Sequence, residues 1–140
     1  MTTSSAVPGA LAALGDTSFV SLTTFRRTGA PVSTPVWVAR DGDVLVVTTP
    51  VDSGKVKRLR HTPRVELRPC SRTGTVAEGA PTVVGHAEVL TDPAAMERPT
   101  ALLRDKYGWE YRVMMLVERV AARRQRQRAI VRITVPDASS

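Results

Sequence analysis

A chain of 140 residues with 42% hydrophobic content is long enough for one domain with an apolar core, and its net charge of +7 indicates an anionic partner. The apolar runs are far shorter than the ~20 residues of a membrane-spanning helix, and the first residues lack the features of a signal peptide, so we expect a cytoplasmic protein with no membrane partner. A single cysteine, Cys70, excludes an intrachain disulfide, and the two isolated histidines, His61 and His86, leave a structural zinc site unsupported, so no metal is expected.

About six segments are typical of strands, because alternating or β-branched apolar residues are bounded by turn residues. In chain order they are residues 19–26, 31–40, 44–49, 65–71, 82–90 and 129–135. The third segment is apolar enough to be buried on both faces, and Asp41-Gly42-Asp43 before it predicts a hairpin. Gly85 in the fifth segment indicates a bulge.

Helices are expected between and after these strands. Residues 6–14 predict a short helix, and residues 53–61 predict a basic one with Ser53 as its N-cap. Asp92 and Pro93 predict the start of a third helix, which we expect to break or kink at Pro99 before it resumes over residues 100–107. The strongest helical pattern covers residues 109–124, where one face carries four apolar residues: Val113, Leu116, Val117 and Val120.

Hairpin-linked strands with few helices predict a mainly β (α+β) fold, a small antiparallel barrel of about six strands with peripheral helices. We expect residues 1–140 to form a single domain, with residues 1–5 frayed.

The basic segment of residues 48–60 is the strongest functional signal. A helix that begins after Ser53 directs backbone N–H groups and the positive end of its dipole toward Lys55, Lys57 and Arg58, an arrangement that attracts a phosphate or another anion. The alternative is a solvated basic helix face. No Gly-x-Ser-x-Gly, Rossmann or Walker motif is present in the sequence. We expect Cys70 to be a small buried residue and not a reactive thiol. A bound cofactor is therefore expected to carry the chemistry.

Residues 24–38 (TFRRTGAPVSTPVWV) and 52–60 (DSGKVKRLR) together resemble the flavin and deazaflavin oxidoreductases that share the pyridoxamine-phosphate-oxidase-like split β-barrel. Within that family they are most similar to the F420-dependent branch. The resemblance extends over residues 19–135 and includes residues 67–70, 85–87, 106–108 and 130–135.

This resemblance implies a homodimer with cofactor sites in grooves between two split barrels. It also implies an oxidoreductase that transfers a hydride between reduced F420 and a small organic acceptor, with FMN as the alternative cofactor. The implied cofactor-binding residues are Ser33, Pro35, Val36, Trp37, Thr48, Thr49, Ser53, Lys55, Lys57 and Arg58. Tyr107, Trp109 and Arg112 are implied contributors from the helical region or across the dimer, and the resemblance assigns no catalytic side chain.

Three alternatives stay open. The chain could be an FMN-binding flavin reductase or oxidase of the same fold, or a cofactor-binding protein without turnover. A nucleic-acid-binding small barrel also fits the positive charge, but the aromatic residues are not interleaved with the basic ones as a base-stacking platform requires.

Overall fold

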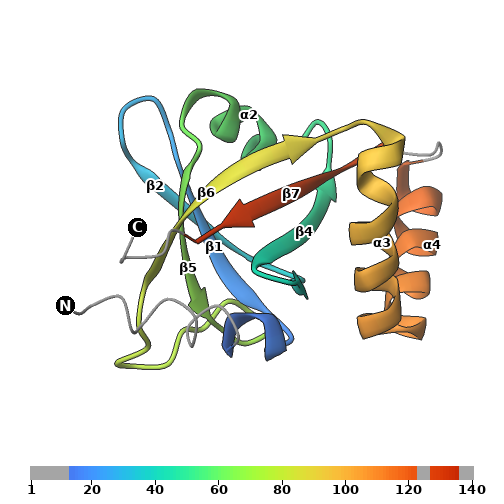
Figure 1. Ribbon diagram of the computed structural model, residues 1–140, viewed down its shortest axis with the longest axis horizontal. Helices are drawn as coiled ribbons and strands as arrows, with labels where there is room; N and C mark the ends of the chain where they lie inside the picture. The colour runs from blue at the N-terminus through green and yellow to red at the C-terminus, as the bar shows by residue number, and fades with distance from the viewer. Residues whose placement is uncertain (1–12, 123–126, 136–140) are drawn as a thin grey trace.

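A computed structural model describes residues 13–122 and 127–135 and shows a curled antiparallel sheet with two helices at one end (Figure 1). The sheet has seven strands in the order β2-β1-β5-β6-β7-β4-β3. The strands are β1 (Val20–Phe25), β2 (Pro31–Val36), β3 (Ala39–Asp41), β4 (Val44–Pro50), β5 (Arg64–Pro69), β6 (Val83–Leu90) and β7 (Arg128–Thr134). The helices are α2 (Gly54–His61), α3 (Pro93–Tyr107) and α4 (Trp109–Ala122). The fold is a split β-barrel, as predicted.

Two apolar clusters hold the sheet in this shape. The larger cluster fills the inside of the curl, where α2 contributes Leu59 and packs against β1 and β6. The smaller cluster lies on the outside, where Leu103 of α3 packs against β3, β4 and β7. Strand β4 contributes to both clusters, because Leu45 lies in the larger cluster and Val46 in the smaller one. The prediction that this strand is buried on both faces is therefore confirmed.

Gly85 allows the sheet to curl tightly at β6. Strand β6 pairs with β5 up to His86 and with β7 from His86 onward, so it changes partners at this point. A Cβ atom at Gly85 would lie 2.8 Å from Cγ2 of Ile133 and 3.2 Å from the carbonyl oxygen of Thr134. The absence of a side chain therefore permits the close approach of β7.

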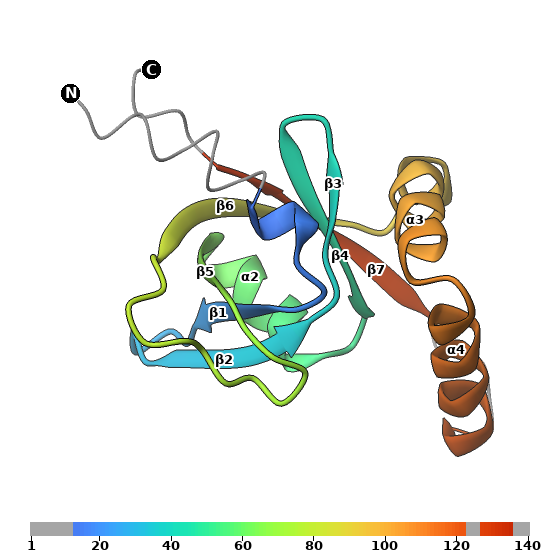
Figure 2. The same ribbon diagram turned by 90° about the horizontal axis from the view of Figure 1, so that it is seen from below.

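The expected single strand over residues 31–40 is wrong, and its division explains why the sheet has seven strands. Strand β2 pairs with β1, whereas β3 pairs with β4 at the opposite edge of the sheet. The two residues between them, Trp37 and Val38, carry the chain from one edge to the other (Figure 2). Continuous apolar alternation does not reveal such a change of partner.

Of the break or kink expected at Pro99, the break is wrong, because α3 is a continuous helix from Pro93 to Tyr107, and the kink stays a prediction. A proline at this position lacks the N–H that would bond to the carbonyl of Ala95. Leu103 and Tyr107, which follow it, are buried against the sheet. We infer that this packing outweighs the single missing hydrogen bond.

Both predicted helix caps are confirmed. The Ser53 hydroxyl accepts a hydrogen bond from the Val56 N–H at 3.3 Å, and the Asp92 carboxylate accepts one from the Ala95 N–H at 3.1 Å. The expected helix over residues 6–14 lies mostly outside the described residues, which show helix at residues 13–16. The expected frayed end, residues 1–5, lies outside them as well. Among the helices described, none is long and apolar enough to cross a membrane.

Candidate cofactor site

The candidate site lies at the seam of the barrel, where β2 and β4 face each other without pairing. Strand β2 forms one edge of the sheet, so its outer side has no ladder partner. On β4, the pairing with β3 ends at Val46, and the following residues pair only with β7. The two strands therefore direct unpaired backbone groups toward the same space, where a ligand can bond to them.

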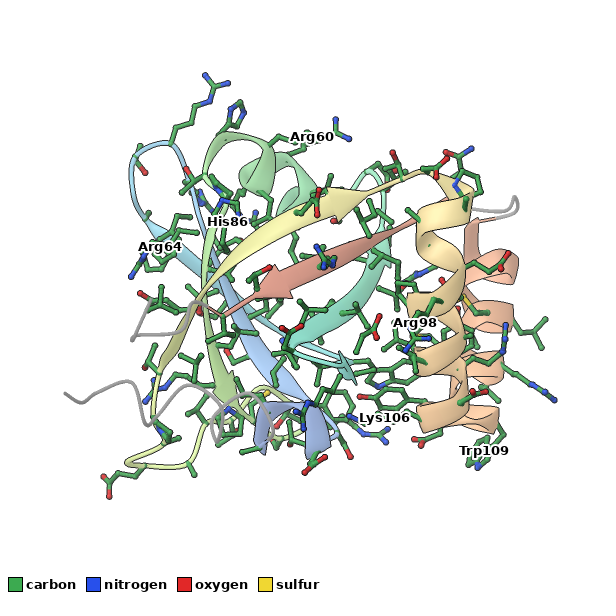
Figure 3. The ribbon with its side chains drawn as sticks, in the orientation of Figure 1. Arg60, Arg64, His86, Arg98, Lys106 and Trp109 are labelled. Carbon is green, nitrogen blue, oxygen red and sulfur yellow. The ribbon has the colours of Figure 1, made fainter. Side chains whose placement is uncertain are left out.

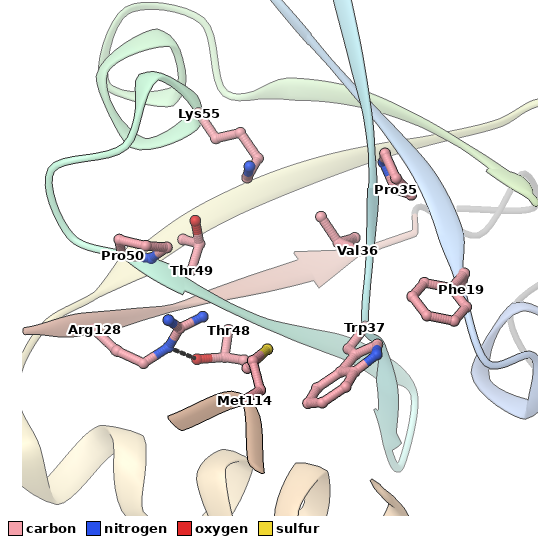
Figure 4. A pocket seen from close by; sticks show the side chains of 10 residues that line it. All are labelled: Phe19, Pro35, Val36, Trp37, Thr48, Thr49, Pro50, Lys55, Met114 and Arg128. Atoms are coloured by element: carbon pink, nitrogen blue, oxygen red, sulfur yellow. Dashed lines mark hydrogen bonds between the residues drawn. The ribbon is translucent and has the colours of Figure 1, made fainter. Parts of the chain in front are cut away.

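A cavity of about 210 Å³ occupies this seam (Figure 4). It is lined by residues from five elements and the segments beside them: Phe19, Pro35, Val36, Trp37, Thr48, Thr49, Pro50, Lys55, Met114 and Arg128. One end of the lining is cationic and the other is aromatic and apolar, so the cavity suits a ligand with an anionic group at one end and a flat apolar group at the other.

The cationic end is built by Lys55 and Arg128. Helix α2 directs Lys55 into the cavity, and the Arg128 Nε donates a hydrogen bond to the Thr48 hydroxyl at 2.9 Å (Figure 4). Burial lowers the pKa of Lys55, and the positive charges of Arg58 and Arg128 lower it further. Within the described residues no carboxylate forms an ion pair with Lys55. A bound anion would relieve this repulsion, so the electrostatics favour an anionic ligand.

The aromatic end is built by Phe19 and Trp37, with Met114 of α4 beside them. The Trp37 ring is stacked on Tyr107, with ring centroids 4.4 Å apart and an angle of 9° between the planes. Tyr107 does not line the cavity and supports the indole from behind. A planar ring system is the kind of ligand that such a wall accommodates.

Six of the ten residues predicted for the cofactor line this cavity. They are Pro35, Val36, Trp37, Thr48, Thr49 and Lys55. Ser53 lies directly behind them, because its hydroxyl caps α2 and accepts a hydrogen bond from the Thr49 hydroxyl at 3.2 Å.

The other three predicted residues lie outside the cavity lining. Ser33 is hydrogen-bonded to the Thr23 hydroxyl at 2.6 Å, and Lys57 is exposed to solvent. The Arg58 Nε donates to the Thr24 hydroxyl at 2.6 Å. Arg58 nevertheless contributes charge, because its positive charge lowers the pKa of Lys55 more than that of Arg128 does.

Four lining residues were not predicted: Phe19, Pro50, Met114 and Arg128. The register of the sheet brings Arg128 opposite Pro50, at the start of β7. The basic run at residues 123–128 was visible in the sequence, but nothing there indicated that its last member enters the site.

Of the three residues that the family resemblance implied from the helical region, one is buried and two are exposed. Tyr107 is buried behind Trp37, whereas Trp109 and Arg112 of α4 are exposed. Trp109 projects from the start of α4 away from the sheet (Figure 3) and is 73% exposed. In a single copy of the chain, neither Trp109 nor Arg112 lines the cavity.

Cys70 does not line this cavity, and no metal centre is found among the described residues. Cys70 is half-buried, and burial raises the pKa of its thiol, which leaves it a weak nucleophile at neutral pH. Among the described residues, no group of three or more His, Cys, Asp and Glu side chains could hold a metal ion.

The titration of Tyr107 should make the stability of the fold depend on pH. Burial raises the pKa of its hydroxyl to about 12, the negative charge of Glu110 adds to this rise, and the hydrogen bond with Val38 opposes it. An unfolded chain with the ordinary pKa of 10.0 therefore loses this proton first. We expect the titration of Tyr107 to leave the free energy of unfolding unchanged below pH 10 and to lower it as the pH rises toward 12.

Denaturant unfolding below pH 10 and again between pH 10 and 12 measures this fall. The Tyr107→Phe variant controls for every other titrating group, because it removes only the hydroxyl. A smaller fall in the variant is expected. An equal fall in both proteins would show that Tyr107 does not contribute.

The split barrel and its seam cavity, cationic at one end and aromatic at the other, can now be compared with known proteins. A family model described as pyridoxamine 5'-phosphate oxidase matches residues 8–139, and the chain belongs to this family. No curated protein sequence matches the chain.

Solved structures show the same fold. An F420 reductase is 20% identical, with a TM-score of 0.58 over 89% of this chain and 91% of the other. A FAD-binding protein from Mesorhizobium loti is 15% identical, with a TM-score of 0.63 over 91% of this chain and 86% of the other. A conserved hypothetical protein from Mycobacterium tuberculosis is 22% identical, with a TM-score of 0.64 over 96% of this chain and 81% of the other.

Proposed function

We propose that this protein is an F420-dependent oxidoreductase that transfers a hydride between the reduced coenzyme and a small organic acceptor. The observation that carries the proposal is the division of the seam cavity into a cationic end with Lys55 and Arg128 and an aromatic end with Trp37. F420 and FMN share this division, since each joins a flat ring system to a phosphate. The F420 reductase of the same fold and the membership of the pyridoxamine 5'-phosphate oxidase family support it.

The residues present fit such a cofactor. Lys55 and Arg128 would hold the phosphate, and Thr48 and Thr49 would add hydrogen bonds to its oxygens. Trp37 and the backbone of β2 would border the ring system. When bound, the cofactor supplies the hydride chemistry. The chain orients it, excludes water from one face and neutralises its negative charge.

FMN is the second candidate cofactor, because its phosphate suits the same two cations and a FAD-binding protein shares the fold. A nucleic-acid-binding role is less consistent with the site, because Phe19 and Trp37 line a cavity and do not form an open stacking surface.

Parallel titrations of the purified protein with F420 and with FMN, each followed by the cofactor's fluorescence, test the proposal. Saturable binding of F420 in preference to FMN supports the deazaflavin function, and a substrate screen with the reduced coenzyme would follow. Preference for FMN would assign the protein to the flavin-dependent branch. Binding of neither would refute a cofactor role for the cavity.

The same proposal includes a homodimer whose second copy completes the site. A volume of about 210 Å³ is less than the roughly 300–1,000 Å³ of pockets for drug-sized ligands, so one copy encloses only part of a flavin-type cofactor. Helix α4 borders the cavity through Met114 and exposes an apolar stripe on its surface. The stripe consists of Trp109, Val113, Leu116 and Val117. A second copy that covers it would also border the cavity.

We expect Leu116→Asp to weaken the dimer about 100-fold, because it would bury a carboxylate in an apolar contact. Leu116 is 59% exposed in the single chain, so the fold should tolerate the change. Sedimentation velocity over a range of concentrations measures the effect. The control is Ala94→Asp, which adds the same side chain at an exposed position of α3. A Leu116→Asp protein as dimeric as the control would exclude the stripe from the interface.

A further inference from the structure

The carboxyl end of α3 binds two segments of backbone that lie beside the aromatic end of the cavity. The Tyr107 hydroxyl accepts a hydrogen bond from the Val38 N–H at 3.0 Å and lies 2.7 Å from the carbonyl oxygen of Ser18. The neighbouring Lys106 ammonium donates to the carbonyl oxygens of Val38 at 2.6 Å, Thr17 at 2.7 Å and Gly15 at 2.8 Å. These five contacts come from two consecutive side chains.

Each of these backbone segments carries a residue that lines the cavity. Val38 directly follows Trp37, and Ser18 directly precedes Phe19. Both positions are where sheet pairing stops, because β2 ends at Val36 and β1 begins at Val20. Side chains of α3 therefore supply the hydrogen bonds that a neighbouring strand would otherwise provide.

The donor and acceptor capacity of these side chains matches their surroundings. An ammonium group has three donors, and Lys106 has three carbonyl acceptors. A hydroxyl has one donor, so Tyr107 donates to Ser18 or to Val38, and Lys106 serves the Val38 carbonyl in either case. The Tyr107 ring also stacks on Trp37. The pair therefore fixes both the backbone and the indole.

We propose that Lys106 and Tyr107 are positioning residues that hold Phe19 and Trp37 at the separation the cofactor ring requires, so that α3 sets the width of the aromatic end. The identity of the ring rests on the proposed function. The positioning itself rests on the hydrogen bonds and the stacked rings. Neither residue lines the cavity, so both act through the residues they hold.

The test uses Trp37 as its own reporter. The chain has two tryptophans, and Trp109→Phe removes the exposed one, which leaves emission from Trp37 alone. Tyr107→Phe and Lys106→Met are then made in this background. Tyr111→Phe is the matched control for the first, because Tyr111 also stacks near Trp37 but no hydrogen bond of its hydroxyl is found among the described residues. Arg104→Met is the control for the second, because it removes one exposed positive charge from α3.

We expect Tyr107→Phe and Lys106→Met each to lower the fluorescence anisotropy of Trp37 in the free protein. We also expect each to raise the Kd for F420 or FMN about tenfold, because the backbone that carries Phe19 and Trp37 must then be ordered during binding. Both controls should stay within about twofold of the parent, because neither removes a side-chain hydrogen bond found among the described residues. Folded variants with unchanged anisotropy and unchanged Kd would overturn the proposal.

Amide hydrogen exchange of the wild-type protein covers the case in which a variant does not fold. The Val38 amide lies outside the sheet ladders, and we expect it to exchange as slowly as the β2 amides that pair with β1. Exchange as fast as that of a turn amide would overturn the proposal. If the wild type binds neither F420 nor FMN, the proposed function fails, whereas the anisotropy and the Val38 exchange still decide whether α3 fixes this wall.

Discussion

Replacing Lys55 with methionine is expected to weaken the binding of F420 or FMN by about 10- to 100-fold, the cost of one charge-assisted hydrogen bond to a phosphate. Methionine keeps most of the apolar stem, so the loss reports on the ammonium group. Lys55 is a half-buried cation of the cavity, and no ion pair between it and a carboxylate is found in the described part of the chain. Burial lowers its pKa, and the positive charges of Arg58 and Arg128 lower it further. Fluorescence titration of the variant with each cofactor measures the effect.

Two further changes on α2 serve as comparisons. Arg60→Met removes an exposed charge from the same helix and should change the affinity by less than about threefold, since exposed charges are screened. Lys57→Met tests the role that the family resemblance implies for an exposed side chain outside the cavity lining. An affinity of Lys55→Met equal to that of Arg60→Met would show that the anion binds elsewhere.

Replacing Leu103 with alanine is expected to lower the free energy of unfolding by about 2–5 kcal/mol. Leu103 is fully buried in the smaller cluster, between α3 and the outer face of the sheet. Its loss leaves a cavity under the helix that carries Lys106 and Tyr107. Denaturant unfolding at neutral pH measures the change.

Leu102→Ala is the matched control, because the neighbouring side chain is only partly buried and packs at the edge of the same cluster. Its cost should be smaller than that of Leu103→Ala. Equal losses in the free energy of unfolding would mean that Leu103 does not hold α3 against the sheet. Another contact would then have to keep Tyr107 behind Trp37.

The local elements were predictable because short-range signals determine them. Ser53 and Asp92 cap helices as their side-chain chemistry predicts, and β4 shows its burial on both faces as an unbroken apolar run. The continuity of α3 through Pro99 was not predictable, because it depends on packing against strands that are distant in sequence.

The residues of the site fall into the same two groups, those placed by local structure and those placed by tertiary pairing. Lys55, Thr48 and Thr49 lie in one short segment, so the loop between β4 and α2 brings them together through local structure. Phe19, Met114 and Arg128 reach the cavity only through sheet register and helix placement. The division of residues 31–40 between two sheet edges, which creates the seam, is likewise a consequence of tertiary pairing.

A crystal structure of the protein with bound F420 would test the central claim most directly. The phosphate is predicted to lie within hydrogen-bonding distance of the Lys55 ammonium and the Arg128 guanidinium, with the ring system against Trp37 at the seam between β2 and β4. A cofactor bound on another surface, or one that places its ring at the Lys55 end, would contradict the assignment of the site.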